Sequence, residues 1–107
     1  MSAERTAESD LSAFLIILSG RKFPLGQTVI TPNALSSLDE GDVRSALEHH
    51  TNGDWGDLDD EDKKANDRAL IEGTRLFSRY KSSKGIKFWI ITEWDRSYTT
   101  ILLPQDY

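Results

Sequence analysis

The chain of 107 residues contains no cysteine. It can therefore form no disulfide, hold no metal through a thiolate and use no thiol as a nucleophile. Long apolar runs are also missing, because the longest one extends only from Ala13 to Leu18, far short of the ~20 residues that cross a bilayer. The charges before this run are acidic, unlike the basic start of a secretory signal. We therefore expect a cytoplasmic protein without membrane contact.

Sequence motifs of common enzyme classes are absent as well. There is no glycine-rich phosphate loop, nucleophile elbow, HExxH pair or dinucleotide fingerprint. The two histidines, His49 and His50, are adjacent, so on a helix their side chains diverge by about 100° and cannot chelate one ion. We expect one of them to meet the core. The sequence gives no support for an enzyme and indicates no cofactor.

The composition is that of one folded domain, with 37% hydrophobic and 29% charged residues. The net charge of −5 hides an uneven distribution, since residues 23–74 carry four basic and twelve acidic side chains, whereas residues 75–107 carry six basic and three acidic ones. Nucleic-acid binding normally requires a strong basic face. We therefore expect no direct nucleic-acid contact, and a protein partner with a basic surface suits the acidic middle segment better.

Three helices are predicted in the middle of the chain. Thr31 is a suitable N-cap for the first, which carries Pro32 in its first turn. Gly41 should interrupt that helix, and Asp42 should cap a second helix ending near His50. The third helix should begin after Asp59 as N-cap and stop at Gly73. The first helix is expected to bury the residues Ala34, Leu35 and Leu38.

The remaining segments predict strands. Residues 27–31 have the β-branched content of a short strand, and residues 75–80, 86–92 and 97–103 read as a meander of two hairpins. The fold class is thus α+β, a single domain with a short N-terminal strand and two or three helices packed on a C-terminal antiparallel β-meander. Residues 1–22 are interpreted as an N-terminal extension, a short helix or strand packed on the core, and residues 23–107 as the domain itself.

The strand predicted over residues 86–92 is apolar on both faces, which is typical of a strand covered on both sides. The predicted helices can cover one face of the sheet. The other face is expected to be covered either by the N-terminal extension or by a second copy of the chain, which would give a homodimer through the sheet face.

A first candidate binding cluster lies in the loop before the third helix. It comprises Asp54, Trp55 and Asp57. Trp55 either stacks against a ligand or anchors the loop to the core. The carboxylates of Asp57 and of residues 59–62 either hold a divalent cation or complement the dipole of the following helix, and their spacing favours the second interpretation.

A second candidate cluster lies at the tip of the last hairpin and comprises Glu93, Trp94, Asp95 and Arg96. An acid, a guanidinium and hydroxyls meet there, which makes this tip the foremost polar candidate. The alternative is a turn held by Asp95 and local hydrogen bonds, with Arg96 paired to Glu93.

Several segments together resemble a family of small bacterial proteins often labelled plasmid-related. They are FPLGQTVITPNAL, GDWGDLDDEDKKANDRALIEG, RLFSRY and KFWIITEWDRSYTTILLPQDY, and the resemblance spans residues 23–107. Trp94 departs from the pattern, which has a small residue there. The positions that match the family pattern are Gly53, Asp54, Trp55, Gly56, Asp57, Leu58, Asp62, Asn66, Leu70, Trp89, Thr92, Glu93, Asp95, Arg96, Ser97, Thr99 and Thr100.

The resemblance brings no established activity, but it implies a bacterial or phage setting and an association with mobile elements. Our leading hypothesis is a non-catalytic protein-binding accessory protein of a mobile element, an inhibitor of a host defence complex being one form of it. The acidic segment from Asp39 to Glu72 would meet the partner's basic surface. The alternative is a small metal-dependent hydrolase or nuclease with Asp54, Asp57 and Glu93 as ligands.

Overall fold

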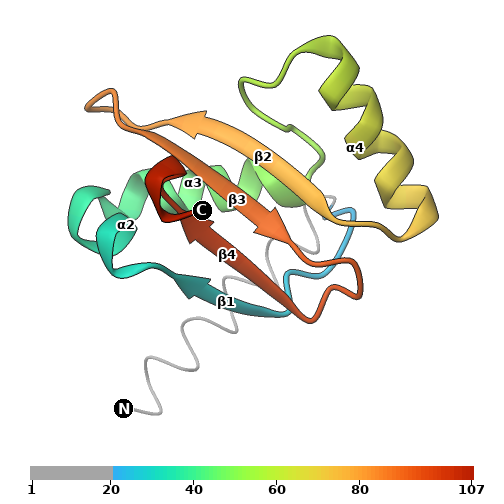
Figure 1. Cartoon of the computed structure of the whole chain (residues 1–107), viewed down its shortest axis with the longest axis horizontal. Helices are drawn as coiled ribbons and strands as arrows, with labels where there is room; N and C mark the ends of the chain where they lie inside the picture. Colours follow the sequence, from blue (N-terminus) through green and yellow to red (C-terminus); the bar gives the residue numbers. More distant parts are fainter. Residues whose placement is uncertain (1–20) are drawn as a thin grey trace.

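The computed structural model describes residues 21–107 (Figure 1). Residues 1–20 of the predicted N-terminal extension, including the short helix or strand expected there, lie outside the described residues. Within the described part of the chain, no helix has the length and apolarity needed to cross a membrane.

The described residues form a single compact α+β domain, as predicted. A short strand comes first, three helices follow, and three strands and one 3-10 turn complete the chain. The elements are β1 (Gln27–Ile30), α2 (Pro32–Ser37), α3 (Glu40–Thr51), α4 (Asp60–Glu72), β2 (Leu76–Lys81), β3 (Lys87–Thr92), β4 (Tyr98–Leu102) and η1 (Pro104–Asp106).

The four strands form one mixed sheet in the order β1-β4-β3-β2. Strands β2, β3 and β4 are antiparallel neighbours, which confirms the predicted meander. Strand β1 joins the outer side of β4 in parallel orientation, and the sequence pattern did not indicate this pairing.

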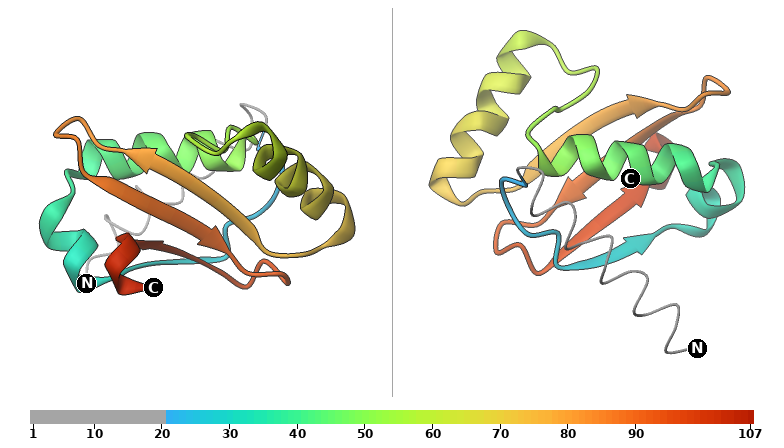
Figure 2. Two further views of the ribbon diagram at one scale, coloured as in Figure 1. Left: turned by 45° about the horizontal axis from the view of Figure 1, so that its top comes forward. Right: turned by 180° about the vertical axis from the view of Figure 1, so that it is seen from behind.

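Helices lie on both faces of the sheet, at one end and along one edge (Figure 2). Helix α3 crosses one face and η1 lies on the opposite face, whereas α4 lies beside the β2 edge (Figure 2). The main core fills the space beneath the helices, where Ala34, Leu38 and Ala46 pack against Phe88, Ile90 and Ile101.

Helix α2 departs from the prediction at Leu35, which is 66% exposed. The helix has only six residues and uses Ala34 and Leu38, four positions apart, as its buried face. Leu35 follows Ala34 by about 100° around the helix axis and therefore points away from the sheet. The predicted cap is confirmed, because the Thr31 side chain accepts a hydrogen bond from the Ala34 amide.

The predicted cap of α3 is wrong. The helix begins at Glu40, directly after Asp39, so Gly41 lies within the helix and does not separate two helices. Asp42 has another partner, because its carboxylate accepts hydrogen bonds from the backbone amide and hydroxyl of Ser83, at 3.1 and 2.8 Å. This contact ties the first turn of α3 to the hairpin between β2 and β3.

Both predicted ends of α4 are confirmed. The Asp59 carboxylate accepts a hydrogen bond from the Asp62 amide at 2.8 Å, which satisfies one of the free N–H groups of the first turn. Gly73 ends the helix with φ of 75°, the left-handed conformation that glycine adopts without a Cβ penalty.

Candidate functional site

Trp55, the aromatic residue of the first candidate cluster, is only 2% exposed. Its ring stacks on Phe23 with centroids 6.1 Å apart and meets His50 edge-on at 5.6 Å. The indole nitrogen donates a hydrogen bond to the Asp67 carboxylate of α4 at 3.0 Å. Trp55 is therefore a buried anchor of its loop, as one of the two interpretations predicted, and it offers no free ring face to a ligand.

The backbone beside Trp55 pairs with the edge of β2. The Asp57 amide donates to the Arg79 carbonyl oxygen at 2.7 Å, and the Arg79 amide donates to the Trp55 carbonyl oxygen at 3.2 Å. Between them Gly56 has φ of 75°, and a Cβ there would lie 1.9 Å from the Arg79 oxygen. Only glycine fits this close approach, so strand pairing explains the second glycine of the GDWGD motif.

The two carboxylates of this loop differ in their contacts. Asp54 accepts a hydrogen bond from the Gly56 amide at 3.2 Å and lies 3.0 Å from the Nδ1 atom of His49. Asp57 is exposed and has no ion-pair partner among residues 21–107. Asp57 is thus the member of the loop cluster that remains available to a binding partner.

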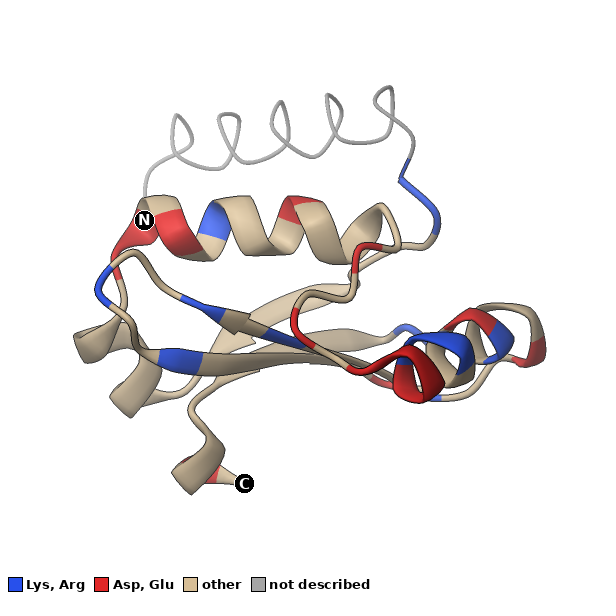
Figure 3. Cartoon of the chain, turned by 90° about the horizontal axis from the view of Figure 1, so that it is seen from above, with Lys and Arg blue, Asp and Glu red and all other residues tan. Residues whose placement is uncertain are grey.

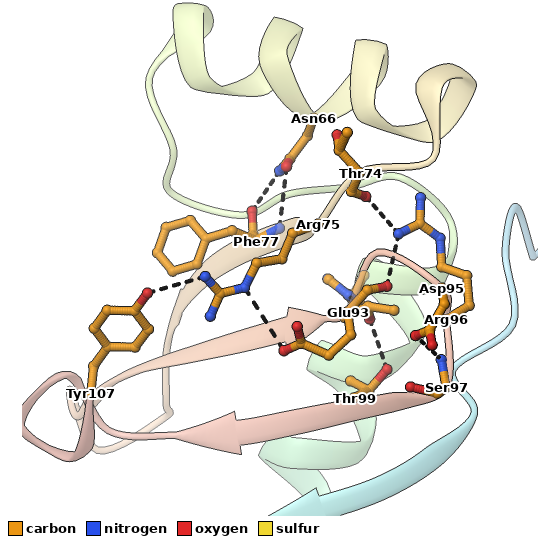
Figure 4. Close-up of polar contacts among 12 residues, drawn as sticks. Asn66, Thr74, Arg75, Phe77, Glu93, Asp95, Arg96, Ser97, Thr99 and Tyr107 are labelled. Atoms are coloured by element: carbon orange, nitrogen blue, oxygen red, sulfur yellow. Dashed lines mark hydrogen bonds and ion pairs between the residues drawn. The ribbon is translucent and has the colours of Figure 1, made fainter.

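Arg96 of the hairpin tip supports the fold from an unusual backbone conformation, with φ of 60°. Its guanidinium donates to the carbonyl oxygens of Thr74 and Glu93 at 2.6 and 3.0 Å (Figure 4). It also donates to the Ala69 carbonyl oxygen at 3.1 Å and lies over the Phe23 ring at 5.8 Å. A cation at the carboxyl end of α4 complements the helix dipole. Arg96 therefore fastens the hairpin tip to that helix end.

The expected ion pair between the side chains of Arg96 and Glu93 is wrong. Of Glu93, Arg96 contacts the backbone carbonyl and not the carboxylate, because its other N–H groups donate to carbonyl oxygens at the end of α4. The Glu93 carboxylate lies instead 3.8 Å from the Nε atom of Arg75. This places Glu93 beside the sheet face opposite α3 (Figure 4).

The other two tip residues behave differently from each other. Asp95 holds the turn as predicted, because its carboxylate accepts a hydrogen bond from the Ser97 amide at 3.0 Å, and hydrogen bonds from Ser97 lower the pKa of Asp95. Trp94 is 66% exposed. It is the large apolar group that the tip presents to solvent.

The two candidate clusters are connected through the protein interior. Phe23, which is 5% exposed, lies between Trp55 and Arg96. Across residues 21–107, no three side chains of the metal-ligating types lie close enough to hold an ion. Asp54, Asp57 and Glu93 therefore do not form the ligand set that the metal-dependent alternative requires.

A buried chain of hydroxyl groups around His50 was not foreseen. The Thr99 hydroxyl donates to the Leu25 carbonyl oxygen at 2.7 Å, so it must accept from Thr92 at 2.7 Å. Thr92 then accepts from the Nε2 atom of His50 at 2.9 Å, which leaves the Nδ1 atom to accept from Ser78 at 2.5 Å. The final carbonyl acceptor thus fixes the Nε2–H tautomer of His50.

This buried chain of hydrogen bonds around His50 has a structural role. His50 and Ser78 are 0% exposed, so the pair resembles a base and a nucleophile but no substrate can reach it. Burial, followed by the nearby charge of Arg96, lowers the pKa of His50 to about 3. The sequence did carry a signal for this chain, namely hydroxyl residues at inward-facing strand positions opposite a histidine on the buried face of a helix.

Comparison of the chain with protein-family models, with curated proteins and with solved structures found no match.

Proposed function

We propose that this protein is a non-catalytic binding protein that engages a protein partner with a basic surface. The observation that carries the proposal is a group of carboxylates at the start of α4, here called the acidic corner. All of them are exposed, and none has an ion-pair partner among the described residues. The acidic corner comprises Asp57, Asp60, Glu61 and Asp62.

The neighbouring acidic residues show why the acidic corner differs from the rest of the segment. Asp59 caps α4, Asp67 accepts the Trp55 indole proton, and Glu40 pairs with Arg44 at 2.6 Å. These carboxylates already have local partners. Acidic residues follow one another closely along the loop and the start of α4 (Figure 3), so a cationic partner would be drawn to this side.

Catalysis has less support, because the groups with chemical capacity are engaged in the fold. The His50 ring lies in a closed hydrogen-bond chain, and the Arg96 guanidinium binds three backbone carbonyls. An accessory role in a bacterial mobile element, such as inhibition of a host defence complex, agrees with a protein that acts by binding. We include that role in the proposal.

The test compares two variants that each neutralise two exposed carboxylates. One variant is Asp60→Asn with Glu61→Gln, in the acidic corner, and its matched control is Glu48→Gln with Glu72→Gln. Affinity capture from the native host, with mass spectrometry as readout, should recover a protein with the wild type and the control but not with the first variant. The purified partner should then bind in a salt-dependent manner.

Two results would contradict the proposal. One is a set of captured proteins that is the same for all three chains. The other is binding of Mg²⁺, Mn²⁺ or Zn²⁺ in calorimetry that Asp57→Asn abolishes, because it would favour the metal-dependent alternative.

A further inference from the structure

The sheet face opposite α3 carries an open pocket of about 320 Å³. Its walls come from β2 and the residue before it, from β3 and from the C-terminal residue, and they are mainly apolar. Trp89 meets Phe77 edge-on at 5.1 Å and Tyr107 at 5.6 Å. The residues that line the pocket are Arg75, Phe77, Trp89, Ile91 and Tyr107.

Arg75 gives this apolar pocket one polar group at a defined place. Its guanidinium donates to the Tyr107 hydroxyl at 3.1 Å and lies over the Tyr107 ring at 5.6 Å (Figure 4). The Nε atom is 3.8 Å from the Glu93 carboxylate. Arg75 remains exposed and is therefore held in position by two neighbours while its charge stays accessible to solvent.

Three more cations share this face of the sheet. Successive strand residues point to opposite faces, and the register pairs Arg79 with Trp89 and Lys81 with Lys87. All three cationic side chains are exposed. Together with the pocket they form a surface that we call the cationic groove, which comprises Arg75, Phe77, Arg79, Lys81, Lys87, Trp89, Ile91 and Tyr107.

Acidic side chains are nearly absent from this face. None of the strand positions that share it by register is Asp or Glu. Glu93 at its end is paired with Arg75, and Asp106 of η1 accepts hydrogen bonds from the side chains of Thr31 and Asn33. The acidic corner adjoins the groove at the β2 edge, where the Asp57 amide donates to the Arg79 carbonyl oxygen at 2.7 Å, so the molecule carries two neighbouring surfaces of opposite charge. The protein partner proposed above accounts for only one of them.

We infer that the cationic groove binds an extended acidic peptide segment of a partner protein, with one apolar side chain seated in the pocket. Side chains two positions apart on a strand are about 6.6 Å apart. The cations at positions 79 and 81 thus match acidic residues at alternate positions of an extended peptide. The apolar anchor would enter between Phe77 and Tyr107, beside the Arg75 charge.

Two other occupants fit less well. A second copy bound face to face would place like charges opposite each other, because a two-fold interface uses the same patch on both subunits. Single-stranded nucleic acid needs open ring faces for base stacking, whereas Trp89 is half-buried and is contacted by both Phe77 and Tyr107. The rings thus form pocket walls.

The test uses an array of short synthetic peptides. Each peptide has one apolar residue at its centre and glutamates at alternate positions on both sides, and the apolar residue differs from peptide to peptide. The best peptide is then labelled with fluorescein and titrated with the whole protein, with anisotropy as readout. Arg79→Gln with Lys87→Gln should weaken binding by about tenfold or more. The matched control, Lys63→Gln with Lys64→Gln on α4, removes the same charge and should leave the affinity unchanged.

Tyr107→Ala separates the apolar pocket from the charge of the groove. Tyr107 is 70% exposed, so the variant should remain folded while peptides with a large apolar anchor lose affinity. Absence of binding across the array would overturn the inference, as would equal losses in the groove and control variants. Tighter binding of oligothymidylate would overturn the inference in favour of nucleic acid as the occupant. A dimer that dissociates in the Arg79→Gln, Lys87→Gln variant would overturn it in favour of a second copy of the chain.

Discussion

The two faces of the sheet use the same strands for different purposes. Toward α3, Phe88, Ile90 and Ile101 are at most 1% exposed, and every hydroxyl in the His50 chain has a partner. Toward η1, Phe77 and Trp89 are half-buried beside exposed cations. The difference indicates that the face toward α3 holds most of the buried core, whereas the exposed side chains of the other face can change at little cost to folding, although Ile91 and Leu102 are buried there as well.

The largest expected effect lies in the second core cluster, in which Trp55 packs with Phe23, Ala69 and Leu76. Trp55→Ala should lower the free energy of unfolding by roughly 3 kcal/mol, because it removes a buried ring that contacts Phe23 and His50. Urea denaturation of the wild type and the variant measures this change. An unchanged midpoint would contradict the contrast between the two faces, since it would mean that this part of the covered face does not stabilise the domain.

The pH dependence of stability is the next largest effect. His50 has its pKa lowered to about 3 in the fold and returns to about 6.5 on unfolding. Unfolding therefore takes up a proton between these values, so stability is complete above about pH 6.5 and falls as the pH is lowered. The slope from this residue reaches about 1.4 kcal/mol per pH unit.

The measurement for His50 is the urea midpoint between pH 7 and 5, where most carboxyl groups remain ionised. His49→Gln serves as the matched control and should keep the slope. If His50→Gln folds, it should lose the slope. If that variant does not fold, the test is NMR of the wild type, in which the ring signals of His50 should stay unchanged through this pH range. Titration of that ring near pH 6.5 would contradict the buried neutral state.

A smaller effect is expected from the N-cap of α4, the helix that lies beside the β2 edge of the sheet (Figure 2). Asp59→Ala should cost about 1 kcal/mol, because it removes the carboxylate that accepts from the Asp62 amide. Asp59→Asn keeps an acceptor and should retain most of the stability. Equal denaturation midpoints for the alanine variant and the wild type would count against the cap.

The smallest effect should come from the cationic groove. Arg79→Gln with Lys87→Gln should change the free energy of unfolding by no more than about 0.5 kcal/mol, since both side chains are exposed. Thermal melting followed by circular dichroism measures this. A much larger loss would mean that the open face also supports the fold, and it would remove the contrast between the faces.

Local sequence signals predicted the elements of the fold well. Thr31, Asp59 and Gly73 each act within one helical turn, so their roles follow from neighbouring residues. The parallel pairing of β1 with β4 joins residues about seventy positions apart, and no local pattern specifies it. For the same reason Asp42 was assigned to a cap, although its partner Ser83 lies in a distant hairpin.

The candidate site was harder to predict than the fold. The polar tip stands out by its chemical groups, but Arg96 is engaged by carbonyls in and just after the last turn of α4 that only the folded chain brings near. The cationic groove combines alternate positions of β2 and β3 with the last residue, Tyr107. The alternation is visible in the sequence, whereas the return of the C-terminus to Trp89 is a tertiary contact.

The amide side chain of Asn66 has a consequence for solubility. It donates to the Phe77 carbonyl oxygen and accepts from the Phe77 amide (Figure 4), as an adjacent strand would. With the Trp55 and Asp57 backbone paired to Arg79, the β2 edge offers few free groups to another chain. Asn66→Leu would uncover part of that edge, and we expect such a variant to aggregate through β2 before the domain loses its fold.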